Sequence, residues 1–183
     1  MSRYWRTAIA GGTYFFTVVT YRRRPILCDA LVRAALRDAV KTVREHYPFT
    51  IDAWVLLPDH LHCMWTLPSG DADFANRWAL IKRMISVACA DQYHRADWLT
   101  ASKKKHREST IWQRRYWEHC IRSETDFANH MGYIYINPVK HGLVYRVGDW
   151  PYSTFHRDVK RGLYAPDWAG VSGGHDLSVG EPA

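Results

Sequence analysis

Hydrophobic and polar positions follow different periods in different parts of the chain, and these periods predict strands in some segments and helices in others. Three short apolar runs are rich in aromatic and β-branched side chains, as expected of buried strands: residues 14–20, 51–57 and 63–67. Pro58-Asp59, between the second and third runs, is typical of a turn. The pattern predicts a β-hairpin that carries His60 and His62 on its second strand.

Helical spacing marks three other segments. Asp29 is the expected N-cap of a helix that runs to about His46. Residues 74–88 repeat apolar side chains every three or four positions. A third helix opens at Ser123–Asp126, a capping box with Asp in place of Glu or Gln. This helix is predicted to end near Asn137-Pro138, because proline disfavours a helical residue before it.

Less regular stretches lie between and after these elements. They are a basic loop at residues 100–110, a fourth strand within 112–122 and an irregular aromatic region at 142–155. Gly, Ser and Pro from about Val171 onward predict a frayed tail. We therefore expect one domain over residues 1–170 and a tail over 171–183.

The order of the expected elements is strand, helix, strand, strand, helix, strand, helix. A hairpin at the centre of this order predicts an α+β domain of ferredoxin-like type, with a mainly antiparallel central sheet and helices packed on it. A chain of 183 residues is long enough to bury one sizeable core.

Composition narrows the partners and the compartment. The formal net charge of +7 favours a polyanion such as nucleic acid, and nine Trp and eleven Tyr offer stacking surfaces for unpaired bases. The four cysteines have no CxxC spacing, which argues against a zinc ribbon or disulfide framework and suits reduced thiols in a cytosol. No signal peptide or membrane-spanning apolar run is expected.

The His-x-His pair is the first candidate for chemistry. Alternate residues of a strand share a face, so His60 and His62 would project side by side, and Leu61 would face the other way. Two neutral imidazoles in this arrangement form half of a site for a divalent metal ion. Two half-exposed strand residues without a ligand are the other interpretation, and the motif alone leaves both open.

The last predicted helix carries the second candidate. Residues four apart share a helix face, so Tyr133 and Asn137 would lie one above the other, whereas Tyr135 points to nearly the opposite side. Only Tyr133 could then act together with Asn137. Packing tyrosines and a helix-ending asparagine are the alternative interpretation.

Three ordered blocks resemble the bacterial REP-associated tyrosine transposases, single-tyrosine members of the HUH nuclease superfamily: residues 53–65, 111–119 and 133–144. The resemblance extends from about Gly11 to Phe155. It implies an HUH fold and metal-dependent cleavage and rejoining of single-stranded DNA beside hairpins formed by repetitive extragenic palindromes (REP). Tyr135 stands where this family commonly has a histidine, so the choice of Tyr133 as nucleophile rests on the helix face.

The resemblance also implies the roles of the candidate residues. His60, His62 and Asn137 would hold Mg²⁺ or Mn²⁺, and Tyr133 would attack the scissile phosphate to give a 5′-phosphotyrosine and a free 3′-OH. A tyrosine with an ordinary pKa of about 10 needs such help at neutral pH. Rejoining would need no ATP, because the covalent intermediate keeps the phosphodiester energy.

Basic side chains outside these motifs are candidates for contacts with the DNA backbone: Arg22, Arg23, Arg24, Lys103, Lys104, Lys105, Arg114 and Arg115. The implied partner is single-stranded DNA with hairpins at the nucleoid of a bacterial cytoplasm, with no membrane involved. Monomer and homodimer both stay open, with monomer preferred. The alternatives are a non-catalytic single-strand binding module, or a replication initiator or relaxase of the same superfamily.

Overall fold

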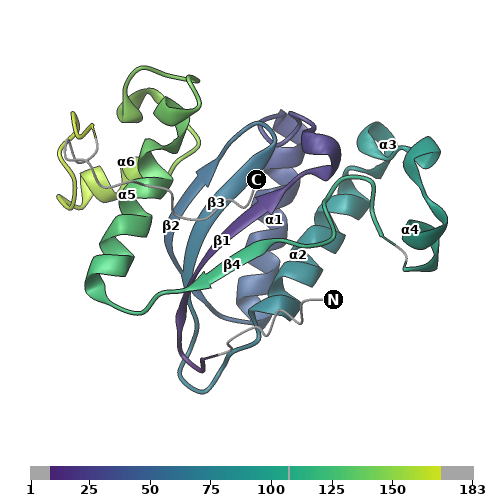
Figure 1. Cartoon of the computed structure of the whole chain (residues 1–183), viewed down its shortest axis with the longest axis horizontal. Coiled ribbons are helices and arrows are strands. Elements are labelled where there is room, and N and C mark those ends of the chain that lie inside the picture. The colour runs from purple at the N-terminus through teal and green to yellow at the C-terminus, as the bar shows by residue number, and fades with distance from the viewer. Residues whose placement is uncertain (1–8, 107, 170–183) are drawn as a thin grey trace.

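The computed structural model describes residues 9–106 and 108–169. Its centre is an antiparallel sheet with the strand order β2-β3-β1-β4. Helices α1 and α2 lie together on one face of the sheet, and α5 lies on the other (Figure 1). The predicted α+β fold, an antiparallel sheet with helices packed on it, is confirmed.

The described residues form the following elements. The strands are β1 Thr13–Val19, β2 Thr50–Leu56, β3 His60–Thr66 and β4 Trp117–Cys120. The α-helices are α1 Ala30–His46, α2 Phe74–Ala88, α3 Ala90–Tyr93, α4 Ala101–Lys105, α5 Glu124–Lys140 and α6 Phe155–Lys160. Short 3-10 helices are η1 Tyr21–Arg23, η2 Ala96–Trp98 and η3 Val147–Asp149.

The sheet is apolar on both faces because helices cover both. Along β1, Tyr14, Phe16 and Val18 belong to the core shared with α1 and α2, whereas Phe15 belongs to the core shared with α5. This two-sided burial explains why the run at 14–20 is continuously apolar instead of alternating. The predicted β2–β3 hairpin is confirmed, and His60 and His62 pair with Val19 and Thr17 of β1.

The predicted end of the last helix at Asn137-Pro138 was wrong. Helix α5 continues through Pro138 to Lys140. Proline removes only one hydrogen-bond donor from the helix. The chain leaves the helix two residues after Lys140, where Gly142 adopts a φ of 67° and its amide donates to the Val139 carbonyl oxygen (2.9 Å). Asn137 therefore lies inside a regular helix, with its side chain fully buried.

Other departures concern segments with weak patterns. The loop predicted at 100–110 contains α4, whose first turn is capped by Thr100, and the strand predicted within 112–122 is confined to β4. The region at 142–155 leads into α6, and its Ser153 bridges to the edge of β2 at Val55. The tail predicted over 171–183 lies outside the described residues, and the extent of the single domain stays a prediction.

Asp29 stands at the N-cap of α1 as predicted, but it does not cap the helix. Its carboxylate accepts a hydrogen bond from the Tyr93 hydroxyl (2.5 Å) instead of one from the α1 backbone. Ser123 does cap α5, and its hydroxyl accepts a hydrogen bond from the Asp126 amide (3.1 Å). Within the described residues, no helix combines the length and apolarity needed to cross a bilayer.

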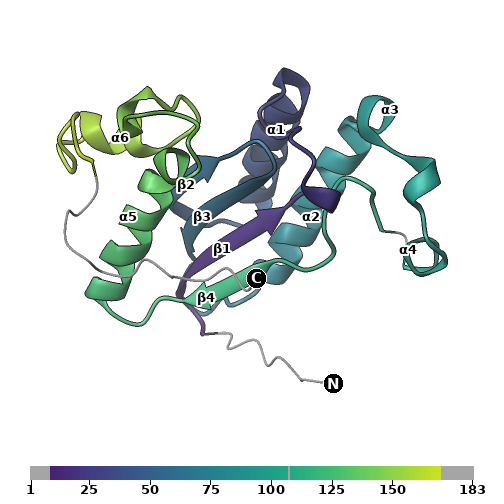
Figure 2. The ribbon, with the colours of Figure 1, turned by 45° about the horizontal axis from the view of Figure 1, so that its top comes forward.

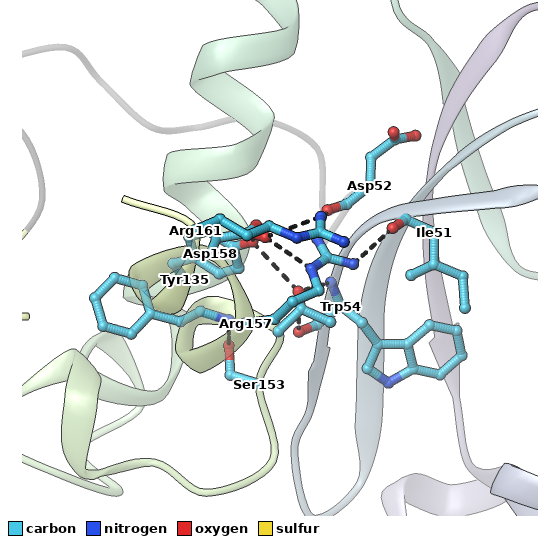
Figure 3. A network of polar contacts seen from close by, with 10 residues as sticks. Ile51, Asp52, Trp54, Tyr135, Ser153, Arg157, Asp158 and Arg161 are labelled. Carbon is cyan, nitrogen blue, oxygen red and sulfur yellow. Dashed lines mark hydrogen bonds and ion pairs between the residues drawn. The ribbon is translucent and has the colours of Figure 1, made fainter. Parts of the chain in front are cut away.

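A polar network holds α6 against α5 and the edge of β2 (Figure 3). Arg157 donates to the backbone carbonyl oxygens of Ile51 (2.8 Å) and Asp52, where β2 has a register irregularity. The buried carboxylate of Asp158 accepts from Arg157 Nε (2.7 Å) and from the Tyr135 hydroxyl. Tyr135 thus connects the side of α5 that faces α6 to the sheet edge.

We predict that Tyr135→Phe destabilises the fold, because it removes a hydrogen bond to a buried carboxylate. The expected loss in the free energy of unfolding is about 1.5–3 kcal/mol, measured by urea denaturation. Tyr145→Phe is the matched control, since the Tyr145 side chain is 98% exposed. Equal unfolding free energies for the two variants would contradict this role of Tyr135.

The same network predicts a pH dependence. Burial alone would raise the pKa of Asp158, but hydrogen bonds from Arg157 and Tyr135 and the positive charge of Arg157 outweigh it and lower the pKa. A depressed folded-state pKa stabilises the fold above the unfolded value of about 3.9, and this stabilisation is lost as the pH falls through the folded-state pKa. Asp158→Asn should therefore be less stable than wild type at pH 7, and urea denaturation should show the difference shrinking below about pH 4. A difference that stays constant down to pH 3 would refute the effect.

Candidate metal centre and nucleophile

His60 and His62 lie side by side on the face of β3 that α5 covers. Both side chains are buried, and their ring centroids are 4.8 Å apart. Strand alternation placed them correctly on one face, since Leu61 and Cys63 belong to the core shared with α1 and α2. Neither histidine is half-exposed.

One nitrogen of each ring is held by a neighbouring residue. His60 Nδ1 lies 2.6 Å from Asp59 Oδ1, and His62 Nδ1 lies 2.8 Å from the Thr17 hydroxyl oxygen. The Nε2 atoms of both rings are buried and have no hydrogen-bond partner among the described residues. With Nδ1–H donating to these oxygens, Nε2 keeps a free lone pair, which is the usual arrangement of metal-ligating histidine.

Asn137 is the third residue with unpaired buried atoms. Its side chain is fully buried, and neither Oδ1 nor Nδ2 has a partner within the described part of the chain. A buried polar group without a partner costs about 1–3 kcal/mol, so a partner from outside the chain is indicated. Two imidazole nitrogens and an amide oxygen are a donor set that a divalent cation accepts, so the residues fit the metal implied by the sequence.

The electrostatics favour a neutral His62 and an ionised Asp59. Burial, followed by charge interactions with His60, His141 and Lys140, lowers the pKa of His62 well below its usual value. Burial would raise the pKa of Asp59, but hydrogen bonds and charge interactions with His60 and Arg23 outweigh it and lower the pKa to about 2. Asp59 is therefore an ionised acceptor for His60 Nδ1–H at neutral pH.

The two tyrosines of α5 point to different surroundings, as the helix-face prediction requires. The Tyr133 ring is buried with its centroid 5.2 Å from that of His62, and Lys140 Nζ lies 5.2 Å from the Tyr133 centroid. The Tyr135 hydroxyl instead donates to Asp158 on α6, and burial and this hydrogen bond raise its pKa. Tyr133 shares the interface with the histidine pair, and Tyr135 does not.

Sequence reasoning missed His141, which lies directly after α5. Its ring centroid is 5.1 Å from that of His60. The spacing of four residues from Asn137 could have indicated it, because such residues share a helix face. The predicted helix end at Pro138 hid this relation.

A second cluster at the junction of β4 and α5 was also missed. His119, Asp126 and His130 offer ligand atoms that lie within 4.8 Å of one another and could hold a metal ion. His119 Nε2 is 2.9 Å from Asp126 Oδ2, and His130 Nδ1 is 3.0 Å from Oδ1. Asp126 also accepts from the Arg122 amide (2.9 Å), so the carboxylate is already well bonded. The i, i+4 spacing of Asp126 and His130 was the available signal.

The candidate DNA-contacting residues do not all reach the surface. Arg22, Arg23 and Arg24 form or follow η1, and Lys104, Lys105 and Arg115 are exposed. Arg114 is exposed and forms an ion pair with Glu108 (3.3 Å). Lys103 is buried, and its ammonium lies 3.2 Å from the Ser109 carbonyl oxygen and 4.0 Å from the Tyr21 ring centroid. Lys103 is thus already engaged within the protein.

Comparison with known proteins identifies the family. A family model described as "Transposase IS200 like" matches residues 9–135. A REP-associated tyrosine transposase of Escherichia coli K12 is 49% identical over 181 residues, covering 99% of this chain and 98% of its own. A Haemophilus influenzae protein is 46% identical over 171 residues, covering 93% of this chain and 94% of its own. A solved REP-associated tyrosine transposase bound to a REP hairpin has a TM-score of 0.82 and 49% identity, covering 100% of this chain and 99% of that one. With these matches, the resemblance inferred from the sequence is confirmed: the chain belongs to the IS200-like transposase family, as a REP-associated tyrosine transposase.

Proposed function

We propose that this protein is a metal-dependent endonuclease and strand transferase that acts on single-stranded DNA beside palindromic hairpins. The observation that carries the proposal is the meeting of four side chains between β3 and α5. His60, His62 and Asn137 present buried atoms without partners in the described chain, and the Tyr133 ring lies against His62. A module that only bound DNA would have no use for these unpaired atoms.

His60 and His62, through Nε2, and Asn137, through Oδ1, would hold Mg²⁺ or Mn²⁺. When bound, the ion would polarise the scissile phosphate and offset its developing charge. Asp59 and Thr17 fix the imidazole rings through Nδ1, so both Nε2 atoms are aimed before any ligand arrives. This arrangement needs no reorganisation of the protein at the moment of reaction.

Tyr133 is the proposed nucleophile. Its hydroxyl oxygen forms a bond to the scissile phosphorus as the bond to the 3′ oxygen breaks. The phenolic proton is released, and the departing 3′ oxygen takes up a proton. The products are a 5′-phosphotyrosine and a free 3′-OH, which can attack in the reverse direction to rejoin a strand. Lys140, near the Tyr133 ring, would offset negative charge on the phenol oxygen.

The proposed substrate follows from charge and from the related structure. The chain carries a formal net charge of +7, and the solved relative is bound to a REP hairpin. We infer a hairpin-bearing single strand as the substrate, with its backbone held by exposed basic groups such as Arg22, Lys104 and Arg115.

We predict that His62→Ala loses both metal binding and DNA cleavage. A ligand at about 100 times its Kd adds about 2.7 kcal/mol to the stability of a protein that binds it only when folded, so Mn²⁺ should raise the Tm of the wild type. His62→Ala should show little of this increase, and the control His46→Ala, on the exposed side of α1, should keep it. A full Mn²⁺-dependent increase in His62→Ala would contradict the site and would point to the His119–Asp126–His130 cluster.

We also predict that Tyr133→Phe abolishes the covalent protein–DNA adduct and that Tyr135→Phe keeps it. Phenylalanine retains the ring and removes only the attacking oxygen. The experiment incubates each variant with labelled hairpin strands and Mn²⁺, resolves adducts on a denaturing gel and maps the modified peptide.

Two outcomes would count against this assignment. A nucleotide mapped to Tyr135 would overturn the choice of nucleophile. The absence of any adduct from wild type, across a library of hairpin strands, would favour a non-catalytic binding module.

A further inference from the structure

A small lobe made of α3, η2 and α4 packs beside the turn that follows β1. Both overall views show this lobe beyond the end of α2, at the opposite end of the molecule from α6 (Figures 1 and 2). Where the lobe meets this turn, the ring of Trp98 faces three guanidinium groups. Arg22, Arg24 and Arg95 lie 4.6, 5.1 and 5.3 Å from its centroid.

These three guanidinium groups carry more positive charge than their surroundings balance. Arg95 pairs with Asp97 (3.2 Å), whereas Arg24 donates to the neutral Tyr93 carbonyl oxygen (2.7 Å). Within the described part of the chain, no carboxylate forms an ion pair with Arg22 or Arg24, and the nearest balance for Arg22 is its charge interaction with Asp97, the carboxylate that already pairs with Arg95. Burial and, after it, the charge of Arg95 lower the pKa of Arg24, as expected of like charges held close together. Three positive groups held around one ring with one carboxylate between them make this surface attractive to an anionic ligand.

The backbone of the turn is strained in order to place these groups. Arg22 and Arg23 have φ values of 59° and 50°, a left-handed conformation that costs free energy in residues other than glycine. The conformation directs Arg22 to Trp98 and Arg23 to Asp59, whose Oδ2 is 3.2 Å from Arg23 NH1. Strain of this kind concentrates at ligand-binding sites.

The position of the turn connects the lobe to the candidate metal centre. Asp59 accepts from Arg23 through Oδ2 and lies against His60 Nδ1 through Oδ1. Phosphates held at the turn would therefore belong to nucleotides near the strand that carries the histidine pair. Trp98 is half-buried, and its ring orders the guanidinium groups without closing them off, since Arg22 and Arg95 are exposed.

We propose that Arg22, Arg24, Arg95 and Trp98 form a clamp for the phosphodiester backbone of single-stranded DNA that leads to the metal centre. This arginine–tryptophan clamp rests on the proposed function, because it assigns a surface to the same substrate. Arginine suits the task because its planar donor fork matches phosphate oxygens and stacks on an aromatic ring.

The test measures DNA binding as a function of salt, by fluorescence anisotropy, in a Tyr133→Phe background. The clamp variant is Arg22→Gln/Arg95→Gln. The control is Arg37→Gln/Lys41→Gln, which removes the same charge from exposed positions on α1. Each phosphate contact with a single strand contributes about 0.7 to the slope of log K against log salt, so two lost contacts should lower the slope by about 1.4. The control should change it little.

Two DNA ligands locate the clamp on the substrate. One is a hairpin with a single-stranded extension, and the other is the same hairpin with a blunt end. If the clamp variant loses affinity and salt dependence only for the extended hairpin, the result supports the clamp. An equal loss for both ligands would place these arginines on the stem and overturn the single-strand assignment, and an effect no larger than that of the control would overturn the clamp itself.

Two further variants separate the role of Trp98 from a folding defect. Trp98→Ala should weaken binding to the extended hairpin by about the same factor as the arginine pair, and Trp98→Phe should restore part of it because a ring remains. Equal affinity of Trp98→Ala and wild type would remove Trp98 from the clamp.

The two proposals fail in different ways. A wild-type protein that forms the covalent adduct but whose clamp variants match the control refutes only the clamp. A wild-type protein that forms no adduct refutes the nuclease, and the binding slopes still decide the clamp.

Discussion

The main constraint on this structure is that it keeps unpaired polar atoms inside an apolar interface. His60, His62 and Asn137 lie between the sheet and α5, within an apolar core that includes Phe15 and Met64. Each unmatched polar group opposes folding by roughly 1–3 kcal/mol. Contacts elsewhere along α5 must therefore offset this cost, which is consistent with a helix that is anchored at several points.

Those anchors lie on the faces and ends of α5 that the candidate site does not use. Ser123 caps the first turn, and Asp126 bonds across to His119 on β4. Farther along, Tyr135 reaches the carboxylate of Asp158, which Arg157 connects to the carbonyl groups of β2. Because successive residues of a helix point in different directions, one helix can carry both an anchoring tyrosine and a candidate nucleophile two residues apart.

Much of this arrangement was predictable because it depends on local geometry. Strand alternation put His60 and His62 on one face, and the helical repeat separated Tyr133 from Tyr135, without knowledge of any distant contact. The prediction of where the last helix ends failed, because the general effect of proline on helices was outweighed by the packing of this particular helix. Pro138 disfavours a helix, yet the helix continues, since only one backbone hydrogen bond is lost and the packing of α5 on the sheet outweighs it.

Contacts between segments that are far apart in the chain could not be predicted from a single sequence. Asp158 is 23 residues from Tyr135, and Arg157 bonds to carbonyl groups more than 100 residues away. Lys103 of the short helix α4 lies over the Tyr21 ring, whereas the sequence pattern presents it as one more charge in a basic loop. Such pairs are fixed by the tertiary fold, so propensity and periodicity do not predict them.

Asp59 shows how the candidate site can be ready before DNA binds. Its two oxygens serve different partners, since Oδ2 accepts from Arg23 of η1 and Oδ1 lies against His60 of the candidate metal centre. Hydrogen bonds and charge interactions with His60 and Arg23 outweigh burial and lower the pKa of Asp59 to about 2, so the carboxylate is ionised at neutral pH. Asp59 holds the His60 ring at Nδ1, and Nε2 of that ring has no partner within the described residues. In the proposed complex, DNA at the turn would engage Arg23, which pairs with Oδ2 of Asp59, and the oxygen that orients His60 would stay in place.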